Sequence, residues 1–354
     1  MGAAASILQG ERRPLHVWVA AIPLGLSVLL LQLFGPTSGP LMASELEALR
    51  SALVPSAFQP GLISFVAVAA AHICACTVVL VLALDMLRTT PNSAGFRRAG
   101  LQVAAGVGVA VVAVMILSDA NAGRISYRAF ETFFTRASGA APIVSPLWSG
   151  GPTPLALATT LPTLFGVVAV AMTSAAANAQ FRFLEAELKA EPPSPEPDGA
   201  TPRRPSERVC AVHDRAKRCL YALAVVLVTS TVAASLYFHL PSQLPLASGF
   251  EKSPEAAFVA RMADFGAELS LLWGMVFSLT LAAAVGLPLF LIQARLRVAL
   301  EEPPLSQASK EERDVIVSSG VLAGGREQVK LLTTLLAPLI AGPVANLVQS
   351  AALF

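Results

Sequence analysis

The uncharged stretch 270–292, SLLWGMVFSLTLAAAVGLPLFLI, decides the fold class of this chain. As a helix it would be ~35 Å long, and the hydrocarbon core of a bilayer is ~30 Å thick. Small residues recur at every fourth position along it, at Gly274, Ser278, Ala282 and Gly286. Because lipid tails are as apolar as leucine, such a row lets a second helix approach closely and pack. We therefore predict a multi-pass membrane protein in which this stretch is the central packing helix.

The composition agrees with this class. Of the 354 residues, 55% are hydrophobic and 14% are charged, whereas soluble domains carry about 25% charged residues. The formal net charge is only +2, which indicates no nucleic-acid partner. None of the four cysteines falls in a segment that we place outside the cell. We therefore expect no disulfide framework.

Six apolar stretches predict an all-α, six-span transmembrane helical bundle within residues 1–298. The predicted spans are about 15–34, 61–87, 99–118, 154–178, 220–239 and 270–292. The third span carries a second, shorter row of small residues, Gly100, Ala104 and Gly108. The fourth helix is expected to continue through 181–189. A Pro-rich cytoplasmic linker then follows at 191–206.

The distribution of basic residues predicts the orientation. Nineteen of the 25 Lys and Arg residues fall in segments that face the cytoplasm when the N-terminus is inside. The composition resembles that of a bacterial protein, so we predict the inner (plasma) membrane with a cytoplasmic N-terminus. Each outer loop contains a candidate short amphipathic helix, at 44–53, 126–136 and 253–263.

Residues 299–354 are predicted to form a C-terminal helical tail. A charged helix at about 309–324 precedes the uncharged stretch 331–354, which is long enough to cross a membrane. Pro338, Gly342 and Pro343 interrupt this stretch. We favour a cytoplasmic or interfacial helix docked on the inner face, with a seventh span as the alternative.

His72 and Cys76 form the candidate metal site. His72 lies ~16 Å into the second span, near the bilayer centre, and Cys76 follows one helical turn later on the same face. An imidazole and a thiol together suit Cu(I). Cys74 points to another face. The structural interpretation, which we favour, is a neutral histidine that is hydrogen-bonded to a neighbouring helix.

The basic segment before the fifth span carries Cys210, His213 and Cys219. Three such residues at this spacing do not match a zinc pattern, which needs four ligands, and we expect them to be solvated or interfacial. The neighbouring Arg and Lys side chains at positions 208, 215, 217 and 218 are suited to anionic lipid headgroups. Coupled carriers usually need an intramembrane carboxylate, whereas Asp85, Asp119 and Glu268 all fall at span ends.

The chain contains no recognisable nucleotide-binding or hydrolase motif, so we predict no catalytic residues and no cofactor. The expected function is that of a scaffold, assembly partner or oligomeric pore component. A transporter or metal-handling carrier that uses His72 and Cys76 is the alternative. The predicted partners are the lipid bilayer and either a second copy of the chain or another membrane protein. A leucine at Gly274 or Gly286 is expected to push the partner helix away, whereas changes at Leu281 and Leu289 should matter less if those two side chains face lipid.

Overall fold

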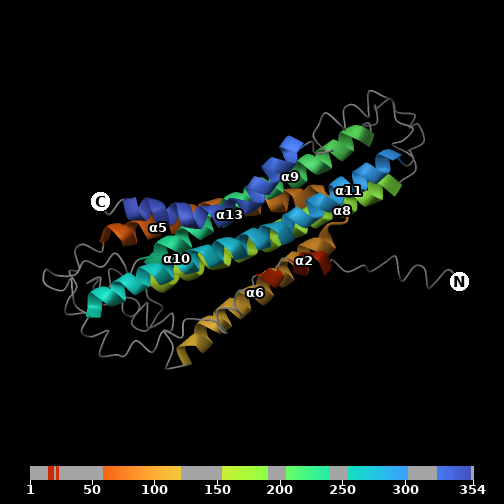
Figure 1. Ribbon diagram of the computed structural model, residues 1–354. Coiled ribbons are helices and arrows are strands. Elements are labelled where there is room, and N and C mark those ends of the chain that lie inside the picture. The colour runs from red at the N-terminus through yellow and green to blue at the C-terminus, as the bar shows by residue number, and fades with distance from the viewer. Residues whose placement is uncertain are drawn as a thin grey trace, which may run out of the picture.

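Every described element of this computed structural model is a helix (Figure 1). The structure describes residues 15–19, 21–23, 59–120, 154–189, 205–239, 254–301 and 325–351. The elements are α2 (Leu15–Val19), α5 (Gln59–Thr89), α6 (Ala94–Ala120), α8 (Pro154–Lys189), α9 (Pro205–His239), α10 (Pro254–Leu281), the π-helix η3 (Ala282–Gly286), α11 (Leu287–Glu301) and α13 (Gly325–Ala351).

Five helices among the described residues are long and apolar enough to cross a membrane, which indicates a membrane-embedded protein. They are Ile63–Thr89, Leu161–Leu188, Glu207–His239, Gly266–Val298 and Glu327–Leu347. The predicted count of six spans is not established. Most of the first predicted span, 15–34, lies outside the described residues, as do the predicted helices 44–53, 126–136 and 309–324. The third predicted span, 99–118, lies within α6, whose side chains are described only as far as residue 110.

One end of the bundle gathers basic side chains, and we call it the basic end. Helices α5, α8 and α11 end there, and α6, α9 and α13 begin there (Figure 1). Among the residues at this end are Arg88, Arg97, Arg208, Lys217 and Arg295. Opposite-charge pairs join its helices, for example Arg208 of α9 with Glu187 of α8 at 2.9 Å. The tight connection between α5 and α6 contains Asn92 at a φ of 55°, a conformation that asparagine tolerates better than most residues.

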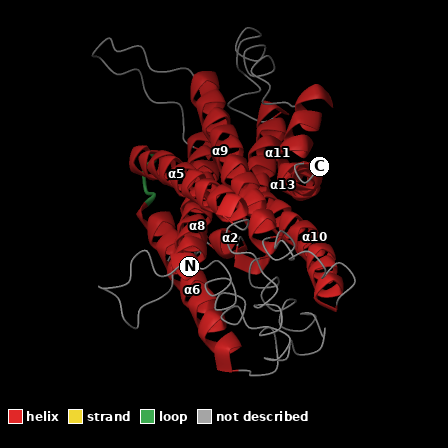
Figure 2. Ribbon diagram, turned by 90° about the vertical axis from the view of Figure 1, so that its left-hand side faces the viewer, coloured by secondary structure: helices red, strands yellow, loops and turns green. Residues whose placement is uncertain are grey.

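The central helix of the bundle is α8, which corrects the prediction that 270–292 is central. Every residue from 169 to 181 is buried, so neighbours surround α8 on all sides over this part. Helices α5, α6 and α9 pack along it, and η3 and α11 also contact it. Helices α6 and α13 lie on opposite sides of the bundle (Figure 1 and Figure 2). The sequence AVAMTSAAANAQF at 169–181 has few bulky side chains, which lets several helices approach its backbone at once.

Helix α10 continues through η3 into α11, so residues 254–301 form one unbroken helical rod. The separate loop helix predicted at 253–263 is wrong, because these residues are the first turns of this rod. The π-turn is explained by Pro288. A proline ring clashes with the carbonyl four residues earlier, here that of Ala284, and it has no N–H to donate. Widening the preceding turn, in which the Leu287 N–H bonds to the Ala282 carbonyl, accommodates the proline.

Helix α9 begins at Pro205, well before the predicted span 220–239. Proline is favourable at the start of a helix, where its missing N–H would have no helical partner, and Glu207 lies in the favourable first turn. The basic segment is therefore the first part of the spanning helix. His213 and Cys219 are buried against neighbouring helices there, so these two side chains are not solvated, whereas Cys210 is partly exposed.

The C-terminal helix α13 does not lie across one end of the bundle, as we had favoured, but runs along it. Near its start, Glu327 pairs with Lys217 of α9 at 3.5 Å. Near its end, Asn346 accepts a hydrogen bond from Ser235 of α9 at 2.6 Å. From Lys217 to Ser235 is a rise of ~27 Å along α9, close to the thickness of a bilayer core. Helix α13 therefore lies alongside α9 and runs in the same direction.

Candidate functional site

His72 is buried between α5, α8 and α9, and only 2% of its surface is exposed. Its Nδ1 lies 2.9 Å from the hydroxyl of Thr229 on α9. Its Nε2 lies 3.4 Å from the Cys76 sulfur on the next turn of α5. On the remaining side, a Cβ on Gly166 of α8 would sit 3.3 Å from Nε2. The missing side chain at Gly166 therefore leaves room for the imidazole.

The neighbouring groups assign the protons of the His72 ring. The Thr229 hydroxyl has one hydrogen and lies within 2.9 Å of the Val226 carbonyl and 3.0 Å of the Val225 carbonyl, which can only accept it. Thr229 therefore accepts a hydrogen bond from His72 Nδ1–H. The unprotonated Nε2 in turn accepts one from the Cys76 thiol. The result is a chain of neutral donors and acceptors that runs from Cys76 through His72 and Thr229 to the backbone of α9.

The two residues of the candidate metal site are thus brought together, and each is already hydrogen-bonded. Cys74, which we expected on another face, is exposed on the surface of α5. Within the described part of the chain, no group of three or more His, Cys, Asp or Glu residues is arranged to hold a metal ion. A metal at this position would have His72 Nε2 and the Cys76 sulfur as its ligands, and binding would require the thiol to lose its proton.

A second soft pair lies at the interface of α5 and α9, nearer to the basic end. The sulfurs of Met86 and Cys219 are 3.2 Å apart, and both residues are buried. Neither was predicted as a site, because the sequence separates them by more than a hundred residues and only antiparallel packing of α5 and α9 brings them together. A thiol and a thioether at this distance form a weak hydrogen bond inside the core.

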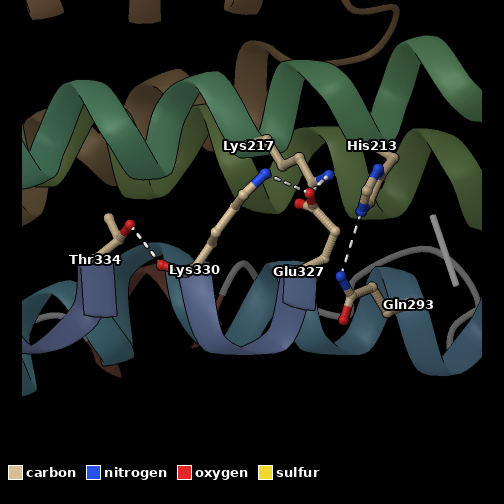
Figure 3. Close-up of polar contacts among 6 residues, drawn as sticks. All are labelled: His213, Lys217, Gln293, Glu327, Lys330 and Thr334. Atoms are coloured by element: carbon tan, nitrogen blue, oxygen red, sulfur yellow. Dashed lines mark hydrogen bonds and ion pairs between the residues drawn. The ribbon is translucent and has the colours of Figure 1, made fainter. Parts of the chain in front are cut away.

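The basic end holds a polar cluster that links α9, α11 and α13 (Figure 3). The Gln293 amide lies 3.3 Å from His213 Nε2, and both side chains are buried. On the adjacent turn of α9, Lys217 pairs with Glu327, which also accepts a hydrogen bond from Lys330 at 2.7 Å. The sequence did not predict this cluster. His213 and Lys217 stood out in the sequence, but their partners Gln293 and Glu327 lie on other helices, far away in the chain.

The interior around α8 contains hydroxyl and amide groups, but most of them bond to nearby backbone. Thr173 donates to the Ala169 carbonyl and Asn178 to the Ser174 carbonyl, each four residues earlier on α8. Gln180 donates to Thr90, which itself donates to the Met86 carbonyl. Among the described residues, the Ser174 hydroxyl and the Gln180 amide oxygen have no partner. These groups therefore do not converge on one another around a common space.

The small-residue row of 270–292 faces α13. A Cβ on Gly274 would lie 2.8 Å from the Pro338 carbonyl oxygen, so the two backbones are in contact there. The Leu339 N–H donates to the Ser278 hydroxyl at 3.1 Å. Gly286 lies against the Leu335 side chain, and Ala282 is partly buried. Helix α10 also packs closely against α9. A Cβ on Gly266 would lie 2.8 Å from the Phe238 carbonyl of α9.

The second row, Gly100, Ala104 and Gly108, faces α8. A Cβ on Gly100 would lie 3.0 Å from the Ala175 Cβ and 3.1 Å from the Met172 sulfur, and Gly108 faces Leu164. Ala104 is buried. In contrast, a Cβ on Gly106 would meet nothing within 4 Å. Up to residue 110, helix α6 therefore packs closely through one face, and no described residue covers the opposite face at Gly106.

Leu281 and Leu289 do not face lipid, so changes there are not expected to be tolerated better than changes in the small-residue row. Leu281 is fully buried and Leu289 is 3% exposed, whereas Leu279 is 52% exposed. Helix α10 and its continuation are therefore in contact with neighbours on more than one face. The π-turn also changes the rotational phase between the two leucines, which a regular helical projection cannot anticipate.

Comparisons of the chain with protein-family models, with curated proteins and with solved structures find no match.

Proposed function

We propose that this chain is a non-enzymatic membrane scaffold or assembly partner. The observation that carries the proposal is the packing of α8. Six alanines between residues 169 and 179 are at most 4% exposed, and the polar side chains among them bond mainly to their own helix. A carrier needs polar groups that converge on a substrate near the midplane, whereas a scaffold needs only a well-packed interior.

The hydrogen bonds of His72 support the same proposal. A proton carrier needs a group that changes its charge during the cycle, and an unpaired charge in a bilayer core is costly. His72 instead donates to Thr229 and accepts from Cys76, and neither partner is a carboxylate that would stabilise an imidazolium. The arrangement favours a role in joining α5 to α9.

The proposed orientation places the basic end in the cytoplasm, in agreement with the excess of Lys and Arg on that side. The N-terminus would then be cytoplasmic. The basic residues of α9 would lie at the level of the lipid headgroups, where Arg215 and Arg218 are suited to anionic lipids. The inner membrane of a bacterium remains the proposed location.

The test of the scaffold function is the assembly state of the full-length protein, purified in a mild detergent and measured by native mass spectrometry. We expect a complex of fixed stoichiometry, either with a second copy or with another membrane protein. In parallel, proteoliposomes should take up Cu(I) no faster than protein-free liposomes. A monomer whose Cu(I) uptake exceeds that background, and loses it in the His72→Gln variant, would contradict the proposal.

The alternative is a metal-handling carrier, which two observations favour. His72 with Cys76, and Met86 with Cys219, place two soft donor pairs along the same interface of α5 and α9. The carrier would bind close to one Cu(I) per pair under reducing conditions. The measurement is the amount of Cu(I) that each variant retains. A lower amount in Cys76→Ser and in Cys219→Ser, with no change in Cys74→Ser, whose cysteine is exposed, would support this alternative over the scaffold.

A further inference from the structure

Helix α13 is the least apolar and the least buried of the candidate spans in the described part of the chain. Of residues 327–347 only Pro338 and Gly342 are buried. The exposed part nevertheless includes Thr333 and Pro343, and the sequence is less apolar than that of α5 or α10. Residues 302–324 separate it from α11, so no short hairpin forces α13 into the membrane together with the preceding span.

The two prolines of α13 weaken its own hydrogen-bond ladder. Pro338 and Pro343 have no N–H, so the carbonyls of Thr334 and Leu339 lose their usual donors four residues later. In hydrocarbon no water is available to replace these donors, and an unsatisfied backbone group is costly. The Asn346 amide would add a further polar group to an isolated helix.

The docked position gives α13 polar partners at three depths, and one of them satisfies the Asn346 amide oxygen. Glu327 pairs with Lys217 at the basic end. In the middle, Ser278 of α10 accepts a hydrogen bond from the Leu339 N–H. Towards the other end, Asn346 accepts from Ser235 of α9. These partners are supplied by α9 and α10.

Two glycines allow these contacts, one on each helix. Gly274 of α10 meets the Pro338 carbonyl, and Gly342 of α13 meets the Ser270 carbonyl. In both cases a Cβ would lie 2.8 Å from the backbone oxygen. A backbone carbonyl cannot move aside as the end of a flexible side chain can. Any larger residue at either glycine would therefore separate α13 from α10.

We propose that α13 is a conditionally inserted span, which crosses the membrane only while it is docked against α9 and α10. When docking fails, α13 stays on the side of the basic end, and the C-terminus remains on that side. Two C-terminal topologies are then available to one sequence. The contact between α13 and α10 selects between them. This inference does not depend on the scaffold function.

The test is the side on which the C-terminus is exposed. A cysteine is appended after Phe354 in full-length protein that carries Cys74→Ser and Cys210→Ser, and sealed vesicles are labelled with a membrane-impermeant maleimide. We expect label on the side opposite to the basic end. In Gly274→Leu and Gly342→Leu, this label should fall at least tenfold and appear on the side of the basic end. Gly106→Leu, whose glycine faces open space, is the matched control and should not change.

An Ala94→Cys reporter at the start of α6, in place of the appended cysteine, shows whether the rest of the bundle inserts correctly. Its label should stay on the side of the basic end in all variants. If the leucine variants are not recovered from the membrane, the milder variants Ser278→Ala and Asn346→Ala test the proposal instead. For each of them we expect label on both sides of the membrane. An unchanged opposite-side label in variants that keep the Ala94 signal would overturn the proposal. So would a parent protein labelled only on the side of the basic end.

Discussion

His72 Nδ1 lies 2.9 Å from the hydroxyl of Thr229, which is 157 residues away in the chain. This hydrogen bond joins the middle of α5 to the middle of α9. Because the bond is buried between the two helices, it favours one rotation of α5 against α9. A single buried polar contact in lipid has this effect because the alternative is an unsatisfied group in hydrocarbon.

Removing the Thr229 hydroxyl should destabilise the bundle. Thr229→Val removes the hydroxyl that accepts from His72 Nδ1–H, and losing a buried hydrogen-bond partner costs about 1–3 kcal/mol. We expect a lower thermal unfolding midpoint in detergent. Thr77→Val is the control, because the Thr77 hydroxyl is exposed and bonds only within α5, to the Ile73 carbonyl. Equal unfolding midpoints for the two variants would show that the His72–Thr229 hydrogen bond does not stabilise the bundle.

Replacing His72 should distinguish hydrogen bonding from titration. His72→Gln keeps a donor that can reach Thr229, and we expect less than about 1 kcal/mol of destabilisation, whereas His72→Leu should cost about 1–3 kcal/mol because Thr229 and Cys76 both lose a partner. The free energy of unfolding in detergent provides the measurement. A His72→Gln protein as unstable as His72→Leu would contradict the structural role.

Alanine should have opposite effects at two glycines. In a helix interior, Gly→Ala usually stabilises by about 0.5–1 kcal/mol. We expect this at Gly106, where a Cβ meets nothing. At Gly266 a Cβ would lie 2.8 Å from the Phe238 carbonyl, so α9 and α10 must separate and the thermal midpoint should fall. A Gly266→Ala protein as stable as Gly106→Ala would show that this backbone contact is looser than the structure describes.

Truncation of two neighbouring leucines should separate buried from lipid-facing positions of α10. Leu281→Ala should cost about 2 kcal/mol, because it opens a cavity in a packed interior and this part of the cost remains when lipid replaces water as the solvent. Leu279→Ala removes a side chain that is 52% exposed and should cost well under 1 kcal/mol. Chemical unfolding of both variants in the same detergent measures the difference.

Cysteine labelling of three loop positions should test the orientation. Asp198→Cys, in the Pro-rich linker, should react with an impermeant reagent only from the cytoplasmic side. Pro146→Cys and Gln243→Cys should react only from outside, because the excess of basic residues places their loops there. The reverse pattern would invert the proposed topology and place the basic end outside.

The sequence alone predicted where several of the described helices lie. The predicted span 61–87 differs by two residues at each end from the observed helix α5, Gln59–Thr89. The predicted continuation of the fourth helix through 181–189 agrees with the end of α8 at Lys189. These predictions succeeded because an apolar run in a bilayer must satisfy its backbone internally, and a helix is the simplest way to do so. Helical hydrogen bonds join residues that are four apart in the chain, so the sequence of the stretch itself is enough to predict the helix.

Only the tertiary structure decided which helix is central and what each helix touches. The run 270–292 looked central because it is uncharged and carries small residues at every fourth position, yet α8 is enclosed instead and the small-residue row contacts α13. His72 finds Thr229, and Met86 finds Cys219, across long separations in sequence. The physical reason is that lipid and neighbouring helices are both apolar. A leucine facing either one looks the same in the sequence, and only the packed bundle distinguishes them.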